Sequence, residues 1–269
     1  MIVNNDRRKS GSHGLAYDDV GKGPVVVLIH GYPFNRSMWT DQVAALKSHY
    51  RVLAVDLRGH GDTPVTSGTS AMEDLAYDIA NLLDHLEVSR AVIVGLSMGG
   101  YVALAFTRLF PLRVRGLVLA DTRAQADTED GRQTRMTQVE KILSEGMVGI
   151  ADAMLPKLLT AETVAKRLDV VRRIRDMMVQ TPPEGAAAAL RGMAQRRDQR
   201  AFLPNILAPT LIIVGREDSI TPLVDSEHMH QQISGSRLQI IDGAAHLSNI
   251  ERPTQFNDAM LKFLKDIEV

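Results

Sequence analysis

The chain has 269 residues, of which 45% are hydrophobic and 23% charged, so its composition is that of a folded globular protein and excludes a disordered or fibrous one. Its 31 basic and 32 acidic residues give a formal net charge of −1, and no stretch gathers enough lysine and arginine to favour nucleic acid as a partner. The absence of cysteine excludes disulfides, thiolate metal sites and a cysteine nucleophile.

The basic cluster near the start of the chain does not lead into the apolar segment of a secretory signal. Residues 6–9 read Asp-Arg-Arg-Lys, and Ser, Gly, Ser and His come next. Apolar runs such as Val25 to Ile29 are far shorter than the roughly 20 residues that a membrane-spanning helix needs. We therefore expect a cytoplasmic protein without a membrane partner. The sequence leaves the oligomeric state open, with a homodimer as one option.

Short runs of β-branched residues predict the strands of a buried sheet. Residues 24–30 form such a run, which ends before Gly31, and this is the pattern of a strand covered by helices on both faces. The same pattern returns at 51–55, 91–95, 116–120, 210–215 and 238–241. Apolar residues at helical spacing lie between the strands, as at Leu75, Ile79 and Leu83. This alternation predicts an α/β fold with a doubly wound, mostly parallel sheet, whose ligand crevice lies beyond the carboxyl ends of the strands.

One long interval interrupts the alternation of strands and helices. Residues 122–200 contain helical patterns only, which predicts a helical cap, or lid, over the carboxyl edge of the sheet. We therefore expect one α/β core domain formed by residues 1–121 and 201–269, with the cap as an insertion. Two consecutive prolines predict a break in the helices of the cap over Thr181–Gly185.

A G-x-S-x-G motif follows the strand at 91–95 directly and leads into an apolar helix over 101–110. In this context the motif is typical of a nucleophile elbow, a strained turn that presents Ser97 to the crevice. Glycines two residues on either side leave room for the strand and the helix to approach. The alternative is that Ser97 only caps the helix. The flanking strand and helix favour Ser97 as a catalytic nucleophile.

A serine hydroxyl needs a base to remove its proton as it attacks, and a histidine is the usual base. His246 lies on the loop after the last predicted strand, before a helix that starts near Glu251. Of the eight histidines, only this one pairs a late position with a loop that follows a strand. His30 and His60 also lie near turns, where a structural role explains them more simply. We predict His246 as the general base.

The third member of such a triad is a carboxylate that fixes the imidazole tautomer. Asp218 fits best, because it follows the strand at 210–215 and immediately precedes a helix started by proline. The alternative is that Asp218 only caps this helix. Glu217 next to it and Asp121, after the strand at 116–120, are the reserve candidates.

Attack on a carbonyl group leaves negative charge on its oxygen, and backbone N–H groups must receive it. Met98, the residue after the nucleophile, supplies one N–H, and the loop after the strand at 24–30 supplies the other. Pro33 has no N–H and favours extended backbone at Tyr32, so we predict Tyr32 as the donor and Phe34 as the alternative. An ordinary strand-to-helix turn would explain the same loop without an oxyanion hole.

Five segments together resemble the successive landmarks of the α/β-hydrolase superfamily, over nearly the whole chain. They are HGYP at 30–33, DLRGHG at 56–61, GLSMGG at 95–100, GRED at 215–218 and GAAH at 243–246. Within the superfamily, the chain is similar to compact carboxylesterases, 3-oxoadipate enol-lactonases and cofactor-free haloperoxidases. The resemblance implies ester or lactone cleavage by Ser97, Asp218 and His246, in that order along the chain, with no cofactor. Epoxide hydrolases and haloalkane dehalogenases place an aspartate where this chain has Ser97, which disfavours an alkyl-enzyme.

Specificity is expected to lie with the cap and with aromatic residues near the oxyanion loop. Phe34 and Trp39 are candidates for lining the acyl pocket, although Trp39 fits a core position equally well. Six of the 12 methionines fall in the cap, and Met136 and Met154 are candidates for an adaptable apolar pocket. Packing of the cap helices is the simpler explanation of these methionines.

The leading hypothesis is a metal-independent serine hydrolase that cleaves small or medium carboxylic esters or lactones through an acyl-enzyme. The same triad would serve a C–C bond hydrolase or a hydroxynitrile lyase. A receptor that keeps the triad and signals through its cap is a third option. Turnover of a substrate separates the enzymes from the receptor, whereas the acyl and alcohol specificity cannot be read from the sequence.

Overall fold

The computed structural model describes residues 7–9 and 14–267. The expectation about a secretory signal depends partly on residues 6 and 10–13, which lie outside the described residues. Within the described ranges, no helix is both long and apolar enough to cross a membrane.

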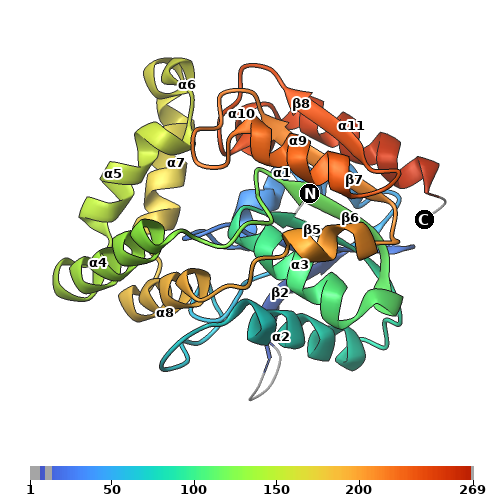
Figure 1. The fold of residues 1–269 in the computed structure, drawn as a ribbon, viewed down its shortest axis with the longest axis horizontal. Helices are drawn as coiled ribbons and strands as arrows, with labels where there is room; N and C mark the ends of the chain where they lie inside the picture. The colour runs from blue at the N-terminus through green and yellow to red at the C-terminus, as the bar shows by residue number, and fades with distance from the viewer. Residues whose placement is uncertain (1–6, 10–13, 268–269) are drawn as a thin grey trace.

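In the part of the chain that the structure describes, eight strands form one sheet (Figure 1). Their order is β1-β2-β4-β3-β5-β6-β7-β8. They are β1 (Arg7–Lys9), β2 (Ala16–Val20), β3 (Val25–Ile29), β4 (Arg51–Val55), β5 (Ala91–Leu96), β6 (Val114–Ala120), β7 (Thr210–Gly215) and β8 (Arg237–Ile241). Neighbouring strands from β4 to β8 run parallel, while β1 and β2 pair antiparallel at one edge. The predicted α/β fold with a mostly parallel, doubly wound sheet is confirmed.

Helices cover both faces of the sheet. Outside the insertion they are α1 (Thr40–Leu46), α2 (Met72–His85), α3 (Met98–Leu109), α9 (Leu223–Gln232), α10 (Ser248–Glu251) and α11 (Pro253–Asp266), with short 3₁₀ turns at Arg36–Trp39, Pro111–Arg113 and Arg200–Asn205. Side chains of a strand alternate between its two faces. Val27 and Ile29 therefore belong to the core with α2, α3 and α9, whereas Val26 and Leu28 belong to the core with α1 and α11. Burial on both faces explains the unbroken apolar runs of these strands.

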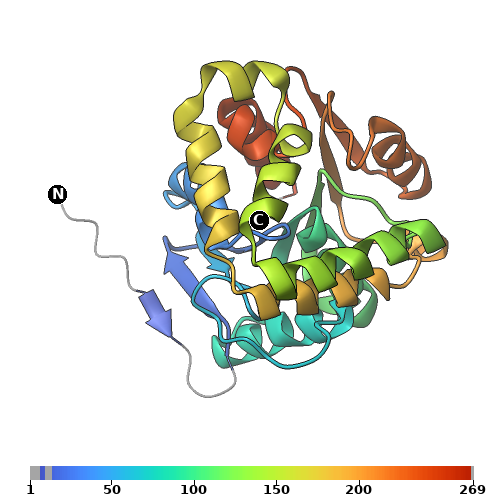
Figure 2. The ribbon, with the colours of Figure 1, turned by 90° about the vertical axis from the view of Figure 1, so that its left-hand side faces the viewer.

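The insertion between β6 and β7 is helical, as expected. It contains α4 (Glu129–Glu145), α5 (Val148–Leu158), α6 (Ala161–Lys166), α7 (Leu168–Val179) and α8 (Pro183–Ala194). Figure 2 shows these helices facing the viewer, on one side of the sheet. Thr128 and Thr160 begin α4 and α6, because each side chain accepts a backbone N–H of the first turn. We call this helical insertion the cap.

The break in the cap helices is shorter than the sequence suggests. Helix α7 ends at Val179 and α8 begins at Pro183, so residues 183–185 are helical and only 180–182 are not. Proline fits the first position of a helix, because the N–H that it lacks would have no helical acceptor there. The first proline therefore ends the break and the second starts the next helix.

The sequence prediction missed the antiparallel edge of the sheet. Strand β2 carries Asp18 and Asp19, a residue type that is depleted in strands, and its last three residues are only half-buried. A strand of this kind, near the edge of the sheet, lacks the apolar run by which the central strands are recognised.

Candidate active site

Ser97 lies in a sharp turn between β5 and α3. Its backbone has φ 54° and ψ −115°, a conformation that residues other than glycine rarely adopt. A Cβ on Gly95 would lie 2.1 Å from the carbonyl oxygen of Gly99, and a Cβ on Gly99 would lie 2.2 Å from that of Ile29. Only glycine at both positions lets the strand and the helix approach this closely. The turn places the serine hydroxyl at the carboxyl edge of the sheet.

The structure brings the three predicted triad residues together. His246 Nε2 lies 2.8 Å from Ser97 Oγ, and His246 Nδ1 lies 2.8 Å from Asp218 Oδ2. The residues come from the loops after β5, β7 and β8, whose carboxyl ends meet at one edge of the sheet. His246 and Asp218 are buried, while Ser97 is half-buried. Such a chain of hydrogen bonds can carry a proton from the hydroxyl to the imidazole as the oxygen attacks.

Hydrogen bonds keep Asp218 ionised. Its Oδ1 accepts the N–H groups of Ile220 and Thr221, and its Oδ2 accepts the Thr221 hydroxyl at 2.7 Å. Burial alone would raise the pKa of Asp218, but the charge of His246 and the hydrogen bonds from His246 and Thr221 lower it below its usual value. The carboxylate therefore accepts the Nδ1 proton of His246, which leaves Nε2 free to accept the proton of Ser97.

Among the described residues, neither reserve candidate makes a hydrogen bond or an ion pair with His246. Glu217 is exposed. Asp121 is fully buried after β6, where it accepts the Gly215 N–H at 2.8 Å and contacts the Ser248 hydroxyl at 2.5 Å. Burial and the negative charge of Asp218 raise the pKa of Asp121 well above its usual value. Asp121 thus links the ends of β6 and β7 to the segment after His246.

The oxyanion loop, residues 30–34, packs against the nucleophile turn. A Cβ on Gly31 would lie 3.4 Å from the Cβ of Ser97. The Phe34 N–H donates to the Gly31 carbonyl at 2.9 Å, whereas the Tyr32 N–H has no acceptor among the residues that the structure describes. Met98 is the first residue of α3, so its N–H lacks a partner within the helix. Tyr32 and Met98 thus each keep an N–H group without an acceptor among the described residues, and their role as oxyanion donors stays a prediction.

Two buried histidines hold the surroundings of the oxyanion loop. His30 Nδ1 donates to the Gly31 carbonyl at 2.9 Å, and its Nε2 accepts the Leu57 N–H at 3.0 Å. Burial lowers the pKa of His30 to about 4 and that of His60 to about 3, so both rings are neutral near pH 7. His60 Nδ1 donates to the Arg58 carbonyl at 2.9 Å. These bonds match the structural interpretation of the two histidines.

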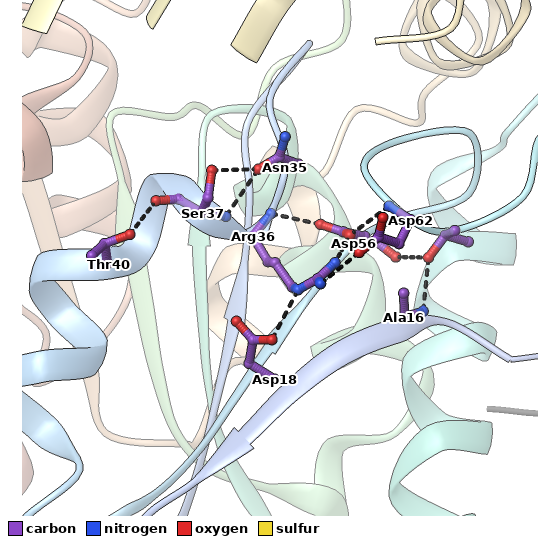
Figure 3. Close-up of polar contacts among 9 residues, drawn as sticks. Ala16, Asp18, Asn35, Arg36, Ser37, Thr40, Asp56 and Asp62 are labelled. Atoms are coloured by element: carbon purple, nitrogen blue, oxygen red, sulfur yellow. Dashed lines mark hydrogen bonds and ion pairs between the residues drawn. The ribbon is translucent and has the colours of Figure 1, made fainter. Parts of the chain in front are cut away.

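An arginine network anchors the far end of the oxyanion loop (Figure 3). The Asp56 carboxylate accepts the backbone N–H groups of Arg36 and Asp62, and it also pairs with the Arg36 guanidinium. The same guanidinium reaches Asp18 at 3.1 Å and Asp62 at 2.7 Å. A cleft of about 590 Å³ lies beside this network, and none of the three triad residues lines it. The network therefore holds the segment after the oxyanion loop in place without contributing side chains to the triad.

The four predicted substrate contacts occupy different places. Phe34 and Trp39 are fully buried in the core with α1 and α11. The Trp39 ring packs against that of Phe256, with the two ring centroids 6.2 Å apart. This is the core position that the sequence leaves open for Trp39. Met154 is half-buried between the two cores, and Met136 is 37% exposed on α4. A role of these residues in substrate binding stays a prediction.

The described residues contain no group of three or more His, Asp or Glu side chains arranged to hold a metal ion.

Comparison with known proteins defines the class. Residues 24–253 match the α/β-hydrolase fold family, so the chain belongs to the α/β-hydrolases. It is 34% identical over 245 residues to 3-oxoadipate enol-lactonase 1 of Acinetobacter baylyi, covering 91% of this chain and 90% of that protein. The predicted resemblance to the superfamily is confirmed.

Solved structures show the same likeness. An esterase from Thermogutta terrifontis, determined with malate bound, superimposes with a TM-score of 0.93 at 40% identity, covering 95% of this chain and 94% of that one. The enol-lactonase from Burkholderia xenovorans superimposes with a TM-score of 0.88 at 34% identity, covering 93% and 96%. The chain is thus similar to hydrolases of esters and lactones along nearly its whole length.

Proposed function

We propose that the protein is a serine hydrolase that cleaves small or medium carboxylic esters or lactones through an acyl-enzyme. The observation that carries the proposal is the continuous chain of hydrogen bonds from Asp218 through His246 to Ser97. The N–H groups of Tyr32, in the 30–34 loop, and of Met98, directly after Ser97, support it, because neither has an acceptor among the described residues. So do the names of similar proteins, which are an esterase and enol-lactonases.

Acylation begins when Ser97 Oγ attacks the carbonyl carbon while His246 Nε2 takes the hydroxyl proton. Negative charge moves to the carbonyl oxygen, where the Tyr32 and Met98 N–H groups stabilise it. The carbonyl double bond then re-forms and the bond between the carbonyl carbon and the ester oxygen of the leaving alcohol breaks. The imidazolium of His246 gives its proton to that oxygen. Asp218 stabilises the transient imidazolium and fixes its orientation. In a lactone, the released alcohol stays in the same molecule as the acyl group.

Deacylation repeats these steps with water as the nucleophile. His246 takes a proton from water as the water oxygen attacks the acyl carbon of the ester on Ser97. His246 then returns the proton to Ser97 Oγ when the carboxylic acid leaves. The steps use only side chains, backbone N–H groups and water. A cytoplasmic location belongs to this proposal and stays a prediction.

A panel of p-nitrophenyl esters of increasing chain length, followed by small lactones, tests the proposed function. We expect release of product from the shorter esters and loss of activity in the Ser97→Ala variant. Unchanged turnover in Ser97→Ala, or no turnover of any ester or lactone, would overturn the proposal. Cleavage of a vinylogous diketone or a cyanohydrin in place of esters would indicate the C–C hydrolase or lyase. A ligand that raises Tm without being turned over would indicate the receptor.

A further inference from the structure

Glu251 is a buried carboxylate that the proposed mechanism does not use. It is the last residue of α10 and only 1% exposed. Its Oε2 accepts the N–H of Ala245, the residue directly before His246, at 2.7 Å. Its Oε1 accepts the N–H and the hydroxyl of Thr160, both at 2.9 Å. One side chain therefore joins the histidine loop to the cap.

A second hydrogen bond joins the same two segments. The N–H of Leu247, directly after His246, donates to the carbonyl of Leu158 at the end of α5. The cap segment from Leu158 to Thr160 thus holds the residues on both sides of the catalytic imidazole. On the other side of the loop, the Glu217 N–H donates to the Ala244 carbonyl. The loop lies between the core and the cap and is bonded to both.

The chemistry of the contacts requires a carboxylate at position 251. Two oxygens that carry no hydrogen accept three donors from two separate segments. An amide has one oxygen, so glutamine would turn its NH₂ group toward the N–H of either Ala245 or Thr160. A buried N–H that loses its acceptor is costly, and the segment moves to find another partner. A shift of the Ala245 N–H would carry His246 with it.

We propose that Glu251 is a positioning residue. By bonding to both Ala245 and Thr160, it fixes His246 relative to the cap, so that the position of the cap sets the distance between the imidazole and Ser97. This inference rests on the proposed function. A displacement on the order of 1 Å between reacting groups lowers a rate about a hundredfold. Loss of the link therefore slows proton transfer in acylation and deacylation alike, whereas substrate binding changes little.

The experiment compares Glu251→Gln with wild type in three measurements. These are kcat and KM on the best p-nitrophenyl ester, the rate at which a phosphonate labels Ser97, and Tm. We expect kcat to fall about tenfold to a hundredfold, with KM within about threefold, because the lost interaction acts on the transition state. Labelling slows by the same factor, since it needs the same base. A purely structural role would lower Tm and leave both rates unchanged.

Two threonines give a matched pair of milder variants. Thr160 and Thr128 each begin a cap helix, but only Thr160 contacts Glu251. Both Thr160→Val and Thr128→Val remove the side-chain hydrogen bond to a backbone N–H at the start of one helix. We expect only Thr160→Val to lower kcat, and we expect the double variant Thr160→Val/Glu251→Gln to be no slower than Glu251→Gln alone, because the hydroxyl acts through Glu251.

The outcomes separate the two proposals. Wild-type protein that is labelled at Ser97, with Glu251→Gln labelled at the same rate, would overturn the positioning role and leave the hydrolase intact. Wild-type protein that is never labelled would overturn the proposed function. If Glu251→Gln does not fold, equal kcat values for Thr160→Val and Thr128→Val would overturn the positioning role.

Discussion

The imidazole Nε2 of His246 lies 2.8 Å from the hydroxyl oxygen of Ser97, although 149 positions separate the two residues in the sequence. Parallel strands cause this proximity, because their carboxyl ends meet at one edge of the sheet. The loops after β5 and β8 lie at that edge, and the cap contacts the loop after β8 directly. The loop that carries His246 is thus bonded to the core and to the cap.

Replacement of Asp218 by asparagine tests how the imidazole is held. The amide that takes the place of the carboxylate cannot supply the charge that stabilises the imidazolium, so we expect kcat to fall by about 10³- to 10⁴-fold with little change in KM. Steady-state kinetics on a p-nitrophenyl ester measures this. The neighbouring variant Glu217→Gln is the control, since that side chain is exposed, and it should keep wild-type activity. Equal losses in the two variants would contradict the assignment of Asp218.

Alanine at Gly99 tests the packing of the nucleophile turn. The added Cβ would lie 2.2 Å from the Ile29 carbonyl oxygen, so we expect a loss of about 1–3 kcal/mol in the free energy of unfolding, together with loss of activity. Gly149 in α5 offers a control, because nothing lies within 4 Å of a Cβ there. Gly149→Ala should stabilise the protein by about 0.4–1 kcal/mol and leave activity unchanged. Urea unfolding measures both effects, and a Gly99→Ala variant as stable as wild type would contradict the close approach.

The pH dependence of stability tests the protonation of Asp121. Its pKa in the folded protein lies well above the ordinary value of 3.8, so the folded state binds a proton that the unfolded chain has lost. Stability therefore decreases as the pH rises above about 4, and Asp121→Asn removes this decrease. We expect the stability of the variant to rise relative to that of wild type between pH 4 and pH 8, measured by urea unfolding. A constant difference across that range would contradict a protonated Asp121.

The buried neutral histidines give the opposite dependence. The pKa of His60 falls from 6.5 to about 3 on folding, so the unfolded chain takes up a proton below pH 6.5 that the folded protein does not. The free energy of unfolding therefore decreases as the pH falls from 6.5 toward about 3, the pKa of His60 in the folded protein. His60→Asn should reduce the slope of unfolding free energy against pH by about 1.4 kcal/mol per pH unit between pH 6 and pH 4.5. An unchanged slope in urea unfolding would show that His60 takes up its proton in the folded state.

Much of the fold and of the candidate site was predictable because both depend on local patterns. Doubly buried strands need apolar runs, and a turn as tight as that at Ser97 needs glycine on both sides. Residues after parallel strands converge, which made Ser97, Asp218 and His246 candidates without any knowledge of side-chain directions. The choice of Tyr32 over Phe34 followed from the backbone restriction that Pro33 imposes.

The remaining features depend on tertiary contacts that leave no local pattern. Glu251 contacts Thr160 and Ala245, which lie 91 and 6 positions away in the sequence. No pattern in the sequence around Glu251 indicates these contacts. The packing of Trp39 against Phe256 in the core is a tertiary contact of this kind. The raised pKa of Asp121 likewise arises from its burial beside Asp218, which the sequence does not reveal.

The most direct test of the central claim is the mass of the protein trapped during turnover of a p-nitrophenyl ester. Acid quenching within the first turnovers, followed by peptide mass spectrometry, measures where the acyl group resides. An acyl-enzyme mechanism predicts a mass increase of one acyl group on the peptide that contains Ser97. Turnover of the ester with the acyl group on another residue would contradict the assigned nucleophile.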